Sequence, residues 1–252
     1  MKIPIIPIFF RSFFLQSVWN YERMQNVGFV FSLIPWLRRL YSNDKKKLYE
    51  RIKAHYGFFN THPYFASLLI GIVMRLEEAY SRNEVDSDQV MRTKTMLAGP
   101  IAAIGDRLIW STWRAFCGIF AVCYYILHGQ FFYTSANIIA GILLYLIVYN
   151  FFGHLPIRLL GIFFGYNYSK EVVVKISKFQ LQKVLEVIRM IGITILLFSS
   201  FIYSISISDN FMLAALFWTN ILLAIVLSRK IAEVVVFALL VILNISLLGL
   251  LQ

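Results

Sequence analysis

Three short polar clusters interrupt the apolar first half of the chain, at residues 19–26, 58–63 and 99–106. Together they place amide, carboxylate, hydroxyl and indole groups next to long apolar runs. A neutral sugar needs this chemistry, because each sugar hydroxyl donates and accepts hydrogen bonds while an indole stacks on the apolar face of the ring. We therefore interpret the clusters as candidate sugar-binding segments.

Seven residues in these clusters are candidates for sugar contact. Glu22, Asn60 and Asp106 are the main ones, since each sits at a break in an apolar run. At such breaks, half-helix ends and unwound backbone can face a cavity. The lesser candidates are Trp19, Gln25, Thr61 and His62.

Each main candidate also has a purely structural interpretation. Asp106 would be the N-cap of the helix that follows it. Glu22 would form a plain ion pair with Arg23 that holds a hairpin. Asn60 and Thr61 would only terminate a helix ahead of the next proline.

Catalytic chemistry finds no support in the sequence. The four histidines show no metal-ligand spacing, and the chain has no glycine-rich phosphate loop and no nucleophile elbow. We therefore expect no metal, no cofactor and no catalytic residue in this chain. His62 is then a structural hydrogen-bonding residue or a sugar contact, and Trp19 is a stacking residue or an interfacial anchor.

The composition excludes an ordinary soluble enzyme. The chain has 252 residues, of which 59% are hydrophobic and only 15% are charged. A soluble domain reaches about 45–50% apolar residues even when glycine is counted. The composition therefore predicts an all-α polytopic protein of the inner (plasma) membrane.

About five membrane-spanning helices are expected in the second half, each long enough to cover about one hydrocarbon core. Almost all Lys and Arg residues fall on one side of these helices, which predicts a cytoplasmic N-terminus and an extracytoplasmic C-terminus. This distribution explains the net charge of +11 without a nucleic-acid partner. The five expected spans are residues 108–127, 136–152, 190–208, 211–227 and 234–251.

The first half has shorter apolar runs, at residues 24–37, 56–74 and 95–105, and polar residues or proline interrupt each of them. Such runs are typical of segments that enter the bilayer and turn back, packed against partner helices. We therefore expect a cytoplasmic-side amphipathic and re-entrant hairpin region at 1–106 and a transmembrane helical region at 107–252.

A strongly basic stretch occupies residues 38–53, with seven basic residues against two acidic ones. The simpler interpretation is a solvated helix face or a contact with lipid headgroups. The sharper one is a docking surface for an acidic soluble partner.

The polar clusters carry a family resemblance. Residues 15–29, with the sequence LQSVWNYERMQNVGF, closely resemble the signature of the IID subunit of the mannose/fructose/sorbose family of the sugar phosphotransferase system (PTS). Residues 58–63, 76–78 and 99–106 match that family in the same order, and residues 165–170 resemble its Gly-Tyr-x-x-Ser-Lys patch. The resemblance covers most of residues 9–190.

The resemblance implies a subunit that is not an enzyme by itself. Such subunits pair with a IIC subunit, as a trimer of IIC–IID heterodimers, and move a hexose or related sugar through the lipid bilayer. The soluble IIA and IIB proteins carry the phosphoryl group, and IIB phosphorylates the sugar at the cytoplasmic face.

The sequence also departs from the family pattern. Alanine stands at 103 where glycine is usual and at 115 where proline is usual, and the bulky Arg107 follows the Gly-Asp pair. The connection at residues 209–210 is much shorter than in typical members. These departures leave an alternative open: a reduced, non-transporting paralogue that docks or regulates the PTS phosphocarriers at the membrane.

Overall fold

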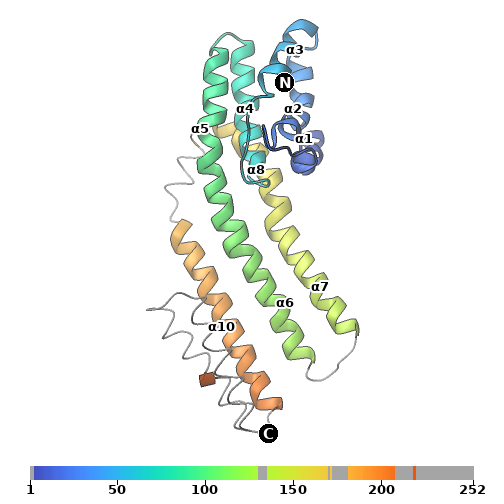
Figure 1. The fold of residues 1–252 in the computed structure, drawn as a ribbon, viewed down its shortest axis with the longest axis vertical. Coiled ribbons are helices and arrows are strands. Elements are labelled where there is room, and N and C mark those ends of the chain that lie inside the picture. The colour runs from blue at the N-terminus through green and yellow to red at the C-terminus, as the bar shows by residue number, and fades with distance from the viewer. Residues whose placement is uncertain (1–2, 130–134, 170, 172–180, 208–217, 220–252) are drawn as a thin grey trace.

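Figure 1 shows the computed structural model of the chain, which describes residues 3–129, 135–169, 171, 181–207 and 218–219. The regular structure of these residues is helical, apart from two isolated bridges that pair Met24 with Asn20 and with Phe59. The expected all-α class is therefore confirmed for the described residues. The shorter helices are α1 (Ile5–Ser12), the 3-10 helix η1 (Phe13–Gln16), α2 (Asn26–Leu40), α3 (Lys45–Ala54) and α4 (Ala66–Ser81).

Two long rods are built from several helical segments each. In the first rod, α5 passes without a break through η2 into α6, because Gly105, Asp106 and Arg114 all keep right-handed helical dihedral angles. In the second, α7 passes through η3 into α8, and α10 lies beside α6 (Figure 1). η2 and η3 are π-helical, a form that appears as short insertions in α-helices. The bounds are α5 (Ser87–Gly105), η2 (Asp106–Trp113), α6 (Arg114–Gly129), α7 (Ser135–Tyr149), η3 (Asn150–His154), α8 (Leu155–Tyr168) and α10 (Leu181–Ile207).

The predicted break at residues 99–106 is wrong. Pro100 lies inside α5, and the helix continues past Asp106 into η2. Proline removes one backbone donor and disfavours a helix interior, yet tertiary packing can override such a local preference. The boundary expected between residues 106 and 107 falls inside this rod, so the division into two regions stays a prediction.

Two helices of the described chain are long and apolar enough to cross a membrane by length and composition, Ser135–Tyr168 and Gln182–Ile202. The first contains the predicted span 136–152, and the second overlaps the predicted span 190–208. The predicted span 108–127 lies inside the α5–η2–α6 rod. The predicted span 234–251 and the short connection at 209–210 lie outside the described residues, as does the predicted span 211–227 apart from residues 218–219.

Helices α1 to α5 and α8 gather at one end of the molecule, which we call the polar end (Figure 1). Its core is the crossing of α4 with α8. Almost every residue of α4 is buried, including those on the α8 side. Gly71 of α4 and Gly165 of α8 face each other so closely that a Cβ on Gly165 would lie 2.1 Å from the carbonyl oxygen of Leu68. Small residues let two helix backbones approach in this way, as they do in membrane-embedded helix pairs.

Candidate functional site

The three polar clusters of the sequence meet in space. The loop before α4 lies between the loop before α2 and helix α5, and Gln25 and Thr61 join them. The Gln25 side chain donates to the Thr61 carbonyl (2.9 Å) and accepts from the Thr61 backbone N–H (3.1 Å). The Thr61 hydroxyl donates to the carbonyl of Ala98 on α5 (2.9 Å). We call this buried arrangement the Gln25–Thr61 lock.

The backbone of the first loop supports the lock. Gln25 N–H donates to the Phe59 carbonyl (2.8 Å), and Met24 adopts a left-handed φ of 56°. The Asn26 side chain donates to the Tyr56 carbonyl (2.7 Å). Buried polar groups are costly unless they are hydrogen-bonded, so these bonds fix the position of both loops. The role of Asn26 was not foreseen among the site candidates, although it lies in the cluster at 19–26.

His62 is buried beside the lock. Its Nδ1 accepts from the Tyr64 backbone N–H (3.3 Å), and its ring packs near Trp110 and against Gly105, where a Cβ would lie 2.3 Å from the ring. Burial lowers the pKa of His62 to about 4, and the charge of Arg158 adds to this effect. The imidazole is therefore neutral at pH 7, with its proton on Nε2. Within the described residues, that Nε2 is buried and has no hydrogen-bond partner.

The other four candidates are exposed. Glu22 forms an ion pair with the neighbouring Arg23 (3.1 Å), as one of the two interpretations predicted, and both side chains are largely exposed. Trp19 is 43% exposed, while Asn60 and Asp106 are also on the surface.

Two of the structural alternatives fail. Asp106 is not an N-cap, because it lies within a continuous helix. Asn60 and Thr61 do not terminate a helix, because α3 already ends at Ala54. Glu22, Trp19 and Asn60 are thus exposed on the two loops, Asp106 is exposed on the α5–η2 helix, and the buried Gln25, Thr61 and His62 hold the loops in place.

A buried ionic cluster above the lock was not predicted. Glu77 of α4 accepts hydrogen bonds from Arg51 Nε (3.1 Å) and the Tyr41 hydroxyl (3.1 Å), and its Oε1 lies 2.9 Å from His55 Nε2. Lys94 of α5 completes the cluster by donating to the His55 carbonyl (2.9 Å). One signal for it was present in the sequence, because Glu77 lies in the 76–78 motif. Arg51, however, was hidden in the basic run that we interpreted as solvated.

The electrostatics of this Glu77 cluster follow from its burial. Burial alone would raise the pKa of Glu77, but hydrogen bonds from His55 and Arg51 outweigh it and bring the pKa to about 2. Burial lowers the pKa of His55 to about 4 and the pKa of Lys94 to about 7. Lys94 is also held over the faces of Phe29 (4.5 Å) and Phe59 (5.2 Å), which favours its charged form. The cluster thus joins α2, α3, α4 and α5.

The motifs at 76–78 and 165–170 also meet. Glu78 of α4 accepts a hydrogen bond from the Tyr166 hydroxyl of α8, and it pairs with Arg75 (3.2 Å) and Arg82 (2.5 Å). This contact reinforces the α4–α8 crossing. Lys170, at the end of the second motif, lies outside the described residues.

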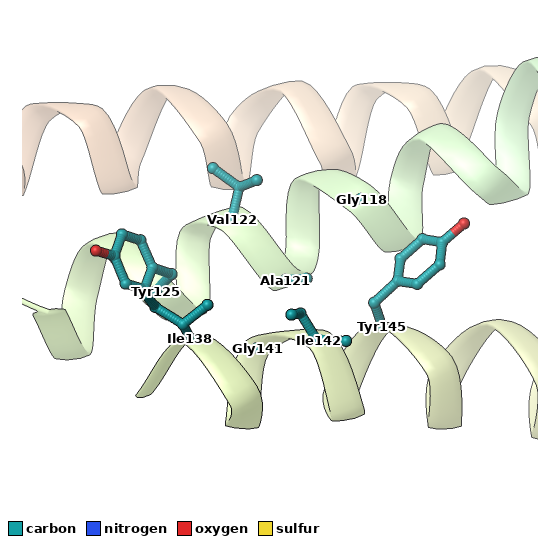
Figure 2. A pocket seen from close by; sticks show the side chains of 8 residues that line it. All are labelled: Gly118, Ala121, Val122, Tyr125, Ile138, Gly141, Ile142 and Tyr145. Carbon is teal, nitrogen blue, oxygen red and sulfur yellow. The ribbon is translucent and has the colours of Figure 1, made fainter. Parts of the chain in front are cut away.

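A separate groove lies between α6 and α7, with a volume of about 560 Å³ (Figure 2). Small residues, Gly118, Ala121 and Gly141, take part in its lining, and the hydroxyls of Tyr125 and Tyr145 lie at its two ends. The remaining lining residues are aliphatic, and none is a carboxylate or an amide. This groove lacks the polar groups that a sugar requires.

The described residues are those of a helical protein with two helices long and apolar enough to cross a membrane and with a buried polar network at one end. The family model of the PTS system mannose/fructose/sorbose family IID component matches residues 2–214. The mannose-specific EIID component of Escherichia coli K12 is 33% identical over 190 residues, 75% of this chain and 64% of that protein. The fructose permease IID component of Bacillus subtilis is 29% identical, over 90% of this chain and 74% of that protein. The chain belongs to the IID family.

Two solved structures are also similar. One, described as a membrane protein, has 30% identity and a TM-score of 0.64, and the match covers 76% of this chain and 67% of the other. The second is the mannose transporter ManYZ in complex with microcin E492, with 24% identity, a TM-score of 0.59 and coverage of 97% and 96%. The match to the Escherichia coli relatives spans only about two thirds (64%) of their length.

Proposed function

We propose that this chain is the IID subunit of a sugar permease and moves a hexose or related sugar together with a IIC subunit. In this proposal IIA and IIB supply the phosphoryl group, and the IID chain has no catalytic residue. One observation supports it above all: three polar clusters distant in sequence converge around the Gln25–Thr61 lock. A rigid polar surface beside apolar helices suits a hydroxyl-rich ligand that crosses a membrane.

In the proposed site, Glu22, Asn60 and Asp106 make hydrogen bonds to the sugar, and Trp19 stacks on its apolar face. Gln25, Thr61 and His62 position these residues. The proposed assembly is a trimer of IIC–IID heterodimers in the inner membrane, and the IIC subunit contributes the rest of the site.

The test uses Asp106→Asn and Asn60→Ala, with sugar binding and uptake measured in membranes that contain equal amounts of the IIC–IID complex. A hydrogen bond to a sugar hydroxyl contributes about 0.5–1.5 kcal/mol, or about 1.5–3 when one partner is charged, so affinity should fall roughly 2-fold to 150-fold. Asp88→Asn is the matched control, because Asp88 is also an exposed acid on the same rod. Normal sugar binding and transport by both site variants would mean that Asp106 and Asn60 do not contact the sugar.

The alternative is a non-transporting paralogue that docks or regulates the PTS phosphocarriers. The short connection at residues 209–210 favours it. If the wild-type complex assembles with IIC yet neither binds nor moves any hexose, this alternative replaces the permease. Neighbouring genes separate the two independently, because a sugar-catabolic gene beside IIA, IIB and IIC genes favours transport.

A further inference from the structure

The surface of α3 and of the preceding end of α2 is the strongest unexplained feature of the polar end. It lies at the end of the molecule opposite the lower ends of α6, α7 and α10 (Figure 1). Five exposed cations and one exposed aromatic residue, which we call the α3 surface, lie there: Arg38, Arg39, Lys45, Lys46, Lys53 and Tyr49. The exposed acids Asp44 and Glu50 lie among them, so cations outnumber acids five to two.

Four of the five cations of this surface are not paired with an acid in the described part of the chain. Arg38, Lys45, Lys46 and Lys53 form no ion pair within the residues that the structure describes. The exposed cations around the α4–α5 connection differ, since they pair with acids of their own segment; these pairs are Arg75–Glu78, Arg82–Glu78, Arg82–Glu84 and Arg92–Asp88. The same end of the molecule therefore has one neutralised half and one basic half.

The α3 surface is also held rigidly. Asp44 caps the helix by accepting from the Lys47 backbone N–H (2.8 Å), and Arg51, on the inner face, is bound to buried Glu77. Leu48 and Ile52 pack against the core. The orientation of the outer face is thereby fixed, so its charges are presented without the ordering cost of a flexible segment.

The distribution of apolar residues argues against a lipid partner. A helix that lies in the membrane interface turns its apolar face toward the lipid. In α3 the aliphatic side chains face the core, and the outer face has no exposed aliphatic residue. Tyr49, 68% exposed among the lysines, is instead a residue type enriched in protein interfaces.

We propose that the α3 surface is a docking site for the acidic face of a soluble protein. This inference rests on the proposed function, which supplies the phosphocarrier IIB as the soluble partner that must approach this subunit. The partner places carboxylates opposite Lys45, Lys46 and Lys53, and an apolar side chain against Tyr49.

The experiment measures association of purified IIB with the IIC–IID complex in nanodiscs of zwitterionic lipid. Lys45→Glu/Lys46→Glu reverses two charges of the α3 surface. It should leave the fold intact, because acidic residues near a helix N-terminus stabilise the helix. The association rate should fall about 10-fold or more, and its dependence on salt should weaken. The single variant Lys46→Glu, which should also slow association, is compared with Arg92→Glu on the neutralised half as its matched control. Both single variants change the net charge by the same amount, and Arg92→Glu should leave association unchanged.

A second measurement locates the surface directly. A fluorophore on Tyr49→Cys should respond to added IIB and should not be quenched by brominated lipids. Quenching by lipid, or unchanged association of the double variant, would overturn the proposal. Sugar binding by the same nanodiscs is recorded in parallel. A complex that binds sugar but shows no α3-dependent IIB association refutes the docking site alone, whereas loss of both points to failure of the proposed function.

Discussion

At the scale of single residues, the buried cation Lys94 makes the stability of the protein depend on pH. The pKa of Lys94 is lowered from 10.5 to about 7 by burial. Between these values the unfolded chain still binds the proton that the folded chain has released, so the free energy of unfolding rises as the pH rises from about 7 to 10.5. His55, whose pKa is lowered to about 4, has the same effect between pH 4 and 6.5.

The expected result is a thermal unfolding temperature, measured in detergent, that increases from pH 7 to pH 9, because the free energy of unfolding rises by roughly 1 kcal/mol per pH unit. Lys94→Met should flatten this profile, because it removes the titrating group and keeps an apolar side chain beside Phe29 and Phe59. Lys53→Met, on the exposed side of α3, should keep it. A profile that is unchanged by Lys94→Met would show that another group causes the pH dependence.

The sequence predicted the polar residues of the site better than their roles. Glu22, Asn60 and Asp106 stand out because polar side chains are rare in apolar runs. Whether such a side chain is exposed or buried depends on partners far along the chain. Gln25 and Thr61 are 36 residues apart, and no local pattern reveals that each satisfies the other.

At the scale of elements, the α4–α8 crossing depends on backbone contact. In Gly165→Leu, the first side-chain atom would lie 2.1 Å from the Leu68 carbonyl oxygen, and this backbone carbonyl in the first turn of α4 cannot move aside without displacing the helix. The variant should lose most of the folded protein, measured as monodisperse yield after membrane extraction.

The control for this prediction is Gly118→Ala inside α6, where a Cβ would meet nothing within 4 Å. Alanine is favoured over glycine in a helix interior by about 1 kcal/mol, so this variant should be as stable as the wild type or more so. Equal yields of Gly165→Leu and wild type would mean that the crossing is looser than the structure shows.

Gly99 and Pro100 explain an error in the predicted elements. Gly99-Pro100 has the pattern of a helix breaker, yet α5 continues through it. The local rule fails because long-range contacts hold the rod: Thr61 binds the Ala98 carbonyl, and the His62 ring packs on Gly105. The apolar helices of the second half were easier to predict, since composition and length alone identify them.

At the scale of the whole molecule, the topology remains a prediction from the charge distribution. A reporter placed within residues 38–53 should register as cytoplasmic, because the α3 surface belongs to the basic side of the chain. A reporter fused after Gln252 should register as extracytoplasmic. A cytoplasmic signal from the second fusion would mean that the number of spans is even where we predict five.

The exposed apolar surface predicts a dependence on the membrane partner. Ile6, Phe10 and Phe14 of the N-terminal helices, and Ile138 and Ile142 beside the α6–α7 groove, are all more than half exposed. Patches of this kind are covered by lipid or by another protein. The chain expressed alone should aggregate or be degraded, and co-expression with IIC should yield one complex. A stable, monodisperse monomer in detergent would contradict this prediction.

The continuous rod of α5, η2 and α6 has a mechanical consequence. Its segments hold 19, 8 and 16 residues, so it is about 60–65 Å long. It is attached to the loops at Ala98, within α5, and its far part, α6, lies beside α7 and α10. The rod therefore acts as a lever. The arm from Ala98 to Gly129 is about 46 Å long, so a tilt of about 5° at the loops would move the far end by about 4 Å, and a small shift at the loops would become a larger displacement beside α7 and α10.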